Sequence, residues 1–249
     1  MASLSDVLYG AAAFAYRGLR VCTKALGVRA SRHPRLAAFV EAVTEPYERA
    51  DVFERQYATG PDHWQYTTNP VEHERFRVAL QMLDAVRGDQ QLGRVLEIAC
   101  AEGVFTEMLA PRCESLLAVD FSEIALERAR ARCMGMQHVT FSRWNLRTDL
   151  VPGAFDVVVV MDVLTLIRRP ARLRQVLEKL AAGLRTGDLL LACDYREEEW
   201  LRPLEDSWVG RRLLFGGKWV IEALVAHPAL ETVHRASTDS HVLALFRKA

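Results

Sequence analysis

From Gly93 onward, short apolar segments alternate with segments of helical pattern, and this alternation constrains the fold more than any other feature of the sequence. The expected strands are residues 94–99, 115–120, 139–143, 155–161, 189–193, 231–235 and 241–246, and the expected helices are residues 104–109, 122–133, 171–184 and 219–226. Four consecutive valines lie within 155–161, which is typical of a strand buried on both faces. Apolar strands separated by helices predict an α/β protein with a parallel sheet covered on both faces.

The chain before Gly93 has no strand pattern. Residues 1–50 read as a helical extension, broken near Gly27 and Pro34, and residues 72–86 also have a helical pattern. Between them, residues 51–70 read as a loop rich in aromatic side chains, and such loops often cover a ligand. We therefore expect an N-terminal helical extension at 1–50 and a main domain at 51–249. Within that domain, we expect a cap at 51–86 and an insertion beside the ligand pocket at 196–218.

The formal net charge is zero, but the charges are unevenly distributed. Residues 1–40 carry six basic side chains and one acidic one, so the rest of the chain has a net charge of −5. An acidic main domain argues against nucleic acid as a partner, because phosphate binding is usually supported by clustered positive charge. The basic segment could contact an acidic partner, a membrane surface or the acidic main domain. We favour packing within the chain or a homo-oligomer built through the N-terminal helices.

The sequence favours a cytoplasmic protein without a metal site. The apolar stretch 7–16 has ten residues, fewer than the roughly 18–20 that a bilayer requires. The positive charges come after this apolar stretch, whereas in a secretory signal they come before the apolar region. The five cysteines contain no CxxC pair, and the seven histidines form no pair with metal-ligand spacing. We therefore expect neither a transmembrane segment nor a disulfide framework, and no metal.

The most informative stretch is residues 95–103, where Glu97, Ala99, Ala101 and Gly103 occupy every second position between an expected strand and an expected helix. Small side chains in such a turn let a ligand approach the backbone at the carboxyl edge of the sheet. Asp120 ends the next strand, where a carboxylate can accept both hydroxyls of a ribose. The spacing by two differs from the G-x-G-x-x-G pattern of dinucleotide-binding proteins, so it argues against a nicotinamide-dependent enzyme.

This pattern resembles motif I of the class I S-adenosylmethionine (SAM)-dependent methyltransferases, E/D-x-G-x-G-x-G, with alanine in place of two glycines. The resemblance implies a Rossmann-like seven-stranded sheet, mostly parallel with the last strand antiparallel, and SAM as the cofactor. Alanine fits the loop only if positions 99 and 101 keep a negative φ, so we expect negative φ at both. The implied cofactor residues are Glu97, Ala99, Ala101, Gly103, Asp120, Phe121, Asn145, Leu146 (these two at the adenine) and Met161.

A narrower resemblance lies upstream, in residues 61–75. This segment is similar to the entry segment of the rhizobial nodulation-type (NodS-like) N-methyltransferases, whose D-P-W-x-x-x-T-S-x-x-E-x-x-R-type pattern is matched with His63 in place of proline. In that family the segment folds over SAM and helps to shape the acceptor site. The resemblance adds Tyr57, Trp64 and Arg75 as cofactor candidates. An aromatic face favours a nearby sulfonium, and Arg75 could bind the methionine carboxylate.

The resemblance implies transfer of a methyl group to a small-molecule acceptor, and specifically N-methylation of an amino sugar or a related amine. Asp162 is the preferred residue for orienting the acceptor, because it follows the fourth strand, and His63 is a second catalytic candidate. Asp194 and Tyr195, at the end of the fifth strand, are weaker choices. Small-molecule O-methylation and a non-catalytic SAM-binding regulatory module remain the alternatives. No N-P-P-Y-type tetrad follows the fourth strand, which argues against a nucleic-acid methyltransferase.

Overall fold

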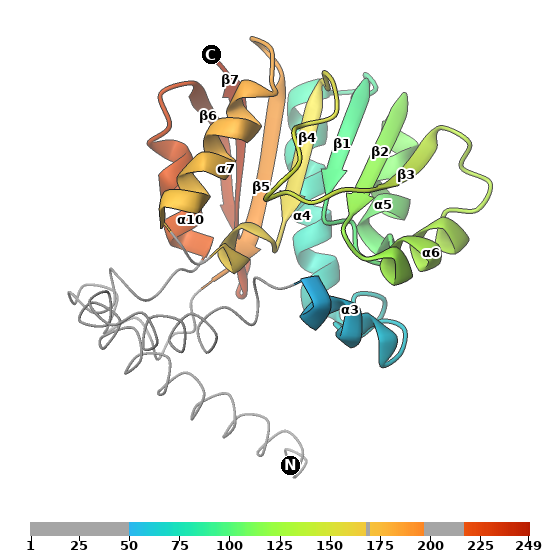
Figure 1. The fold of residues 1–249 in the computed structure, drawn as a ribbon. Coiled ribbons are helices and arrows are strands. Elements are labelled where there is room, and N and C mark those ends of the chain that lie inside the picture. The colour runs from blue at the N-terminus through green and yellow to red at the C-terminus, as the bar shows by residue number, and fades with distance from the viewer. Residues whose placement is uncertain (1–49, 168–169, 197–216) are drawn as a thin grey trace, which may run out of the picture.

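A computed structural model describes residues 50–167, 170–196 and 217–249 of the chain. Its helices are α3 (Ala50–Ala58), α4 (Pro70–Arg87), α5 (Val104–Leu109), α6 (Glu123–Arg132), α7 (Pro170–Ala182) and α10 (Gly217–Val225), with short 3-10 turns η2 (Ala110–Arg112) and η3 (Leu164–Leu166). Its strands are β1 (Arg94–Ile98), β2 (Ser115–Asp120), β3 (Val139–Arg143), β4 (Val157–Met161), β5 (Leu189–Tyr195), β6 (Leu230–Ser237) and β7 (His241–Lys248) (Figure 1).

The seven strands form one sheet in the order β3-β2-β1-β4-β5-β7-β6. All pairs from β3 to β5 are parallel, whereas β7 is antiparallel to both of its neighbours, β5 and β6. The expected mostly parallel sheet with an antiparallel last strand is therefore confirmed. The two central strands β1 and β4 are almost entirely buried, as their continuous apolar sequence predicts.

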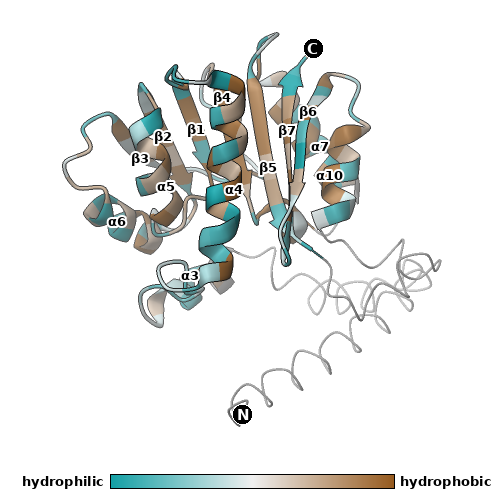
Figure 2. Ribbon diagram, turned by 180° about the vertical axis from the view of Figure 1, so that it is seen from behind, coloured by the Kyte–Doolittle hydropathy of each residue, from teal (hydrophilic) through white to brown (hydrophobic). Residues whose placement is uncertain are grey.

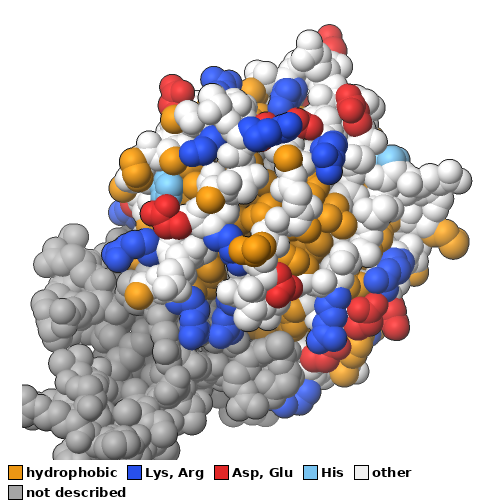
Figure 3. Space-filling model, turned by 45° about the horizontal axis from the view of Figure 1, so that its top comes forward, with side chains coloured by type: hydrophobic (Ala, Val, Ile, Leu, Met, Phe, Trp, Pro, Cys, Tyr) orange, Lys and Arg blue, Asp and Glu red, His pale blue; other side chains and the backbone are white. Residues whose placement is uncertain are grey.

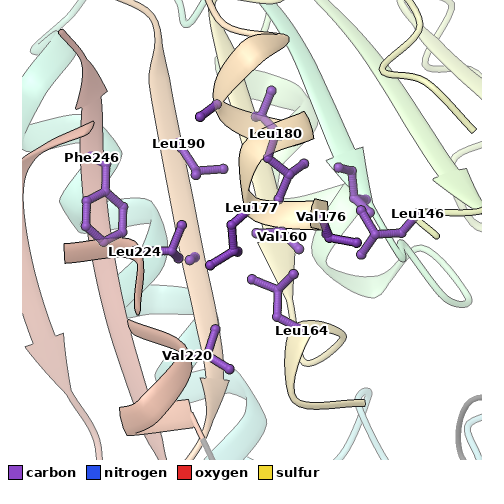
Figure 4. Close-up of a cluster of buried hydrophobic side chains, with 14 of the residues drawn as sticks. Leu146, Val160, Leu164, Val176, Leu177, Leu180, Leu190, Val220, Leu224 and Phe246 are labelled. Carbon is purple, nitrogen blue, oxygen red and sulfur yellow. The ribbon is translucent and has the colours of Figure 1, made fainter. Parts of the chain in front are cut away.

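Helices cover both faces of the sheet. On one face, α4 and α5 bury apolar side chains such as Phe76, Leu83 and Phe105 against alternate residues of the central strands. Figure 2 shows this face, with largely hydrophobic strands behind α4. On the other face, side chains of α7 and α10, among them Leu177 and Leu224, pack with Val160 and Leu190 of the sheet (Figure 4). These two layers hold the carboxyl ends of the parallel strands in fixed positions.

The segment expected to be a loop at 51–70 is partly helical, so that prediction was wrong for α3. Phe53 and Tyr57 lie one helical turn apart, and both pack against Trp64. The sequence obscured this helix because Gly60 and Pro61 follow it closely. Helix α4 begins where Asn69 accepts a hydrogen bond from the Val71 amide, with Pro70 in the first turn.

Two expected features lie outside the described residues: the helical extension at 1–50, except for Ala50, and the insertion at 196–218, except for its ends. Of the helices that the structure describes, none has the length and the apolar composition to cross a membrane. On the face seen in Figure 3, basic and acidic side chains lie interspersed around hydrophobic ones. The described surface on that side therefore offers mixed charge.

Candidate functional site

The candidate site lies where the strand order reverses. Strand β1 has β2 on one side and β4 on the other, so the connections after β1 and β4 diverge at the carboxyl edge of the sheet. In open α/β sheets, ligands bind at such switch points. The loop from Ala99 to Gly103 follows β1, Asp120 is the last residue of β2, and Asp162 directly follows β4.

The loop after β1 has left-handed backbone at its three small residues. Ala99 has φ +62°, Ala101 has φ +49° and Gly103 has φ +78°. The expectation of negative φ at both alanines was therefore wrong. The turn adopts the conformation that glycine would favour, at a cost of about 1–2 kcal/mol for each alanine. Hydrogen bonds hold it there, because Cys100 N donates to Val119 O at 3.1 Å and Gly103 N to Cys100 O at 2.9 Å.

Asp120 connects this loop to the end of β2. Its Oδ2 accepts a hydrogen bond from Ala101 N, and its Oδ1 accepts one from Ser122 N, both at 3.0 Å. Each carboxylate oxygen keeps a second lone pair, so both can still accept a ribose hydroxyl. Burial raises the pKa of Asp120 to about 6, although the backbone amides oppose the shift. Asp120 is therefore both the support of the strained loop and a candidate ligand group.

Beneath the loop, Glu97 is buried on β1, and burial raises its pKa to about 8. Glu97 Oε2 and, on α3, Glu54 Oε2 are buried oxygens without a hydrogen-bond partner among the described residues. The charge of Glu54 contributes to the raised pKa of Asp120, so these carboxylates surround the same region. SAM carries hydrogen-bond donors, its ribose hydroxyls and its α-ammonium, that match such unpaired acceptors. The residues present therefore fit this cofactor.

Aromatic side chains of the expected cap cover this region. The Trp64 ring lies 4.9 Å from the Tyr57 ring and 6.1 Å from the Tyr66 ring, and Phe53 packs edge-on against Phe121 at 5.8 Å. Tyr57 is buried, which raises the pKa of its hydroxyl and keeps it neutral. Phe121 directly follows Asp120, so these rings lie beside the proposed ribose contact.

A polar cluster follows β4 and contains Arg75, Asp162 and His241. Arg75 is 2% exposed, and its guanidinium pairs with Glu72 at 2.6 Å and with Asp162 Oδ2 at 2.8 Å. It also approaches the Met161 sulfur at 3.6 Å. Two of its three donor nitrogens are thus committed to side-chain carboxylates, and the third, Nη1, faces the Met161 sulfur.

Asp162 has φ +51° and turns its other oxygen, Oδ1, to within 3.4 Å of His241 Nε2. Burial opposes its charge, but Arg75 and His241 outweigh burial and lower the pKa of Asp162. Glu72, Asp162 and His241 are a group whose ligand atoms lie within 4.8 Å of one another, as in many metal sites. Here the Arg75 guanidinium already supplies a positive charge to both carboxylates of this group.

Two neighbours on β5 complete the cluster. Asp194 is fully buried, accepts hydrogen bonds from the Thr165 amide and hydroxyl, and has a pKa raised to about 8, chiefly by burial. Tyr195 is 50% exposed and packs edge-on against His241 at 5.3 Å. These weaker candidates therefore do lie beside Asp162, with Tyr195 at the open side.

Three other predicted residues are less directly connected to this cluster. His63 is exposed and contacts Thr59 and Trp64 within the cap. Asn145 accepts a hydrogen bond from the Arg147 amide at 2.9 Å, which fixes the turn after β3. Leu146 is buried in the hydrophobic core, as Figure 4 shows, so its side chain belongs to the packing that supports the site. Among the described residues, no hydrogen bond or ion pair joins His63 to Asp162.

Sequence reasoning missed His241, Glu54, Glu102 and Arg128. His241 begins the last strand, far along the chain, and reaches Asp162 only because β7 pairs with β5. Glu102 lies at a variable position of the motif, and Arg128 looks like an ordinary helix charge. Only three-dimensional proximity identifies these residues.

A comparison with models of known protein families shows to which family this chain belongs. The family model described as "Nodulation protein S (NodS)" matches residues 45–223, well over half of the sequence. The chain belongs to the NodS family. The resemblance inferred from residues 61–75 and from the loop after β1 is therefore confirmed.

Individual NodS proteins agree with this assignment. Nodulation protein S of Bradyrhizobium diazoefficiens is 32% identical over 151 residues, which cover 61% of this chain and 70% of that protein. The protein of the same name from Rhizobium tropici is 31% identical over 130 residues, covering 52% of this chain and 53% of that protein. Crystallised N-methyltransferase NodS from Bradyrhizobium japonicum WM9, in complex with S-adenosyl-L-homocysteine (SAH), is 27% identical with a TM-score of 0.67, covering 82% of this chain and 98% of that one.

Proposed function

We propose that this chain transfers the methyl group of SAM to the nitrogen of a small-molecule amine, and that the acceptor is an amino sugar or a related amine. One observation carries the proposal: a NodS-family chain has a left-handed loop after β1 that is hydrogen-bonded to Asp120, directly beside the anionic cluster at Asp162. The NodS crystal structure compared above is that of an N-methyltransferase in complex with SAH. SAM is accordingly the cofactor of this enzyme.

The cofactor is held by backbone and side chains at the ends of β1 and β2. Asp120 accepts the ribose hydroxyls, and the loop of Ala99, Ala101 and Gly103 gives the ligand close access to the backbone. The remaining contacts are assigned to the cap and to the turns after β1 to β4. They comprise Tyr57, Trp64, Arg75, Glu97, Phe121, Asn145, Leu146 and Met161.

The acceptor side is negatively charged. Glu72 and Asp162 carry two negative charges against one positive charge on Arg75, so the cluster favours a cationic ammonium over a carboxylate substrate. Asp162 orients this amine, which must lose a proton to solvent water before its lone pair attacks the methyl carbon. The new N–C bond then forms as the S–C bond breaks, and the sulfur leaves as a neutral thioether. Alignment of the two reactants supplies the main acceleration, up to roughly 7–11 kcal/mol. His63 is retained as a second catalytic candidate.

The test combines binding with turnover. Calorimetry should detect SAH binding to the purified protein, and a radiolabelled methyl group should pass from SAM to an amino sugar with a free amine. The matched control is the same sugar with its amine acetylated, because it keeps every hydroxyl but has no basic nitrogen. Equal transfer to both sugars would show that the enzyme methylates a hydroxyl oxygen instead of the amine nitrogen. Binding of SAH without transfer to any of a panel of amines and alcohols would instead support a regulatory SAM-binding module.

We also infer the wider organisation of the protein. Residues 51–249 form the methyltransferase domain, with a cap at 51–86 and a substrate-site insertion at 196–218, and the protein works in the cytoplasm. The basic N-terminal segment, residues 1–50, joins copies of the chain into a homo-oligomer. Light scattering after size exclusion should then give a mass above 28.1 kDa. A monomer at both low and high salt contradicts this inference.

A further inference from the structure

Arg128, on α6, binds two separate segments of the protein at once. Its Nη1 donates to Glu102 Oε1 at 2.5 Å and to Gly60 O at 2.9 Å, and its Nη2 donates to Tyr57 O at 2.9 Å. Glu102 belongs to the loop after β1, whereas Tyr57 and Gly60 belong to the cap. One guanidinium therefore joins the cofactor loop and the cap to α6.

Glu102 completes this junction from the other side. Its side chain is 5% exposed, and its Oε2 accepts a hydrogen bond from Asp62 N at 2.7 Å. The backbone oxygen of the same residue accepts a hydrogen bond from Arg132 Nε at 3.0 Å. A buried carboxylate is stable only when it is paired and hydrogen-bonded, and here Arg128 and the cap amide do both.

The contact with α3 is electrostatically favourable for a second reason. Helix α3 ends at Ala58, and the carbonyls of Tyr57 and Gly60 lie at and just beyond this end. The last carbonyls of a helix lack partners within the helix and carry the negative end of its dipole. The Arg128 guanidinium places a positive charge on the Tyr57 carbonyl in the last turn of α3 and also binds the Gly60 carbonyl two residues beyond the helix, so it fixes the position of α3.

We propose that Arg128 and Glu102 are positioning residues for SAM, which fasten the aromatic cap over the adenosine end of the site. The proposal rests on the proposed function. Helix α3 carries Phe53 and Tyr57, and these rings pack against Phe121 and Trp64 beside Asp120. Through this arrangement, two charged residues set the affinity for the cofactor by closing the cap.

The experiment measures SAH affinity by calorimetry and amide hydrogen exchange in residues 50–68, first for the wild type and then for Arg128→Gln and Glu102→Gln. Each substitution should weaken SAH binding about tenfold and accelerate exchange in the cap, while exchange in β1 and β4 stays unchanged. The double variant should resemble either single variant, because both remove the same junction. With SAM saturating, kcat should stay close to wild type while KM for SAM rises, a division that general loss of stability would not produce.

Arg130→Gln is the matched control. Arg130 lies two residues after Arg128 on the same helix and pairs with Glu123 at 2.7 Å, and both of these side chains are nearly half exposed. Within the described part of the chain, Arg130 makes no hydrogen bond to a cap residue. It should bind SAH as the wild type does. Arg128→Lys keeps the charge but lacks the fork that reaches three acceptors, so it should recover only part of the affinity.

The outcomes are separable. If Arg128→Gln binds SAH within twofold of wild type and cap exchange does not change, the positioning role is wrong. If the wild type itself binds no SAH, the proposed function fails. In that case, accelerated cap exchange in the ligand-free Arg128→Gln protein would still support the junction, and unchanged exchange would overturn it.

Discussion

The guanidinium of Arg75 lies 2.8 Å from the carboxylate of Asp162, and this ion pair joins α4 to the residue that follows β4. Arg75 is 2% exposed and is one of the largest fully buried side chains that the structure describes. The pair therefore has two consequences: it secures a helix to the sheet, and it keeps a carboxylate ionised at the edge of the candidate site. These consequences can be tested separately.

Arg75→Met should lower the free energy of unfolding by about 3–5 kcal/mol, because it leaves two carboxylates without their buried counter-charge. Urea denaturation followed by circular dichroism measures the change. Arg77→Met serves as the control on the same helix, since Arg77 and its partner Glu74 are both about half exposed, with side-chain values of 54% and 52%. The control should change stability by less than about 0.5 kcal/mol. Equal losses in the two variants would show that the buried pair has no special role.

Asp162→Asn should lower kcat for methyl transfer about 10- to 100-fold, because a neutral amide no longer attracts and orients an ammonium group. SAH affinity should change little. Since the pKa of Asp162 is lowered below its usual range, the loss should be constant across an assay range of roughly pH 6–9. Asp156→Asn, just before the start of β4, is the control and should keep kcat. A wild-type kcat in Asp162→Asn would remove Asp162 from the mechanism.

Ala99→Gly and Ala101→Gly should each stabilise the ligand-free protein by about 1 kcal/mol, since glycine adopts positive φ without steric strain. The gain is reduced by the greater freedom of glycine in the unfolded chain. Ala131→Gly, at an exposed position of helix α6, should instead destabilise the protein by about 1 kcal/mol. Denaturation midpoints compare all three. Destabilisation by the two loop substitutions would mean that the alanine methyl groups make contacts that outweigh the strain.

SAH affinity should decrease as the pH falls through about 6, because protonation of Asp120 removes an acceptor for the ribose hydroxyls. The limiting slope is about tenfold per pH unit for one proton. Asp120→Asn should bind SAH weakly at every pH, without this slope. Calorimetry between pH 5 and pH 8 provides the comparison. A flat profile in the wild-type protein would argue that Asp120 does not contact the ligand.

Ligand-free protein should become less stable as the pH rises from about 4.5 to about 8. The pKa of Glu97 is about 8 in the folded state, against 4.5 as its ordinary value, so the folded state keeps a proton that the unfolded chain releases over this range. The stabilisation is fully present below pH 4.5 and is lost as the pH passes 8. Glu97→Gln should lose less stability over this range, and exposed Glu114→Gln should behave as the wild type. Parallel curves for all three proteins would contradict the buried position of Glu97.

The sequence predicted the sheet well, because apolar runs and turn residues act locally. The strand 139–143, for example, has the predicted bounds, and the helix expected at 122–133 is α6, with Ser122 as its N-cap. Helix α3 was missed since its pattern is short and its neighbours are typical of loops. The φ angles of Ala99 and Ala101 could not be derived from propensity, because the loop amides of Cys100 and Ala101 donate hydrogen bonds to Val119 and Asp120 of the next strand. The contact of His241 with Asp162 depends on strand order, which local patterns do not encode.

The strand order has a consequence for how the protein is made. Strand β7 is synthesised after β6 but lies between β5 and β6, so β6 has no neighbour in the sheet until β7 has been added. A chain that ends before His241 therefore leaves β6 and one edge of β5 without the strand that pairs with both. Unpaired edges of this kind invite aggregation. We expect loss of β7 by truncation to promote aggregation, and the completion of the acceptor side of the site, to which His241 belongs, to be a late event in folding.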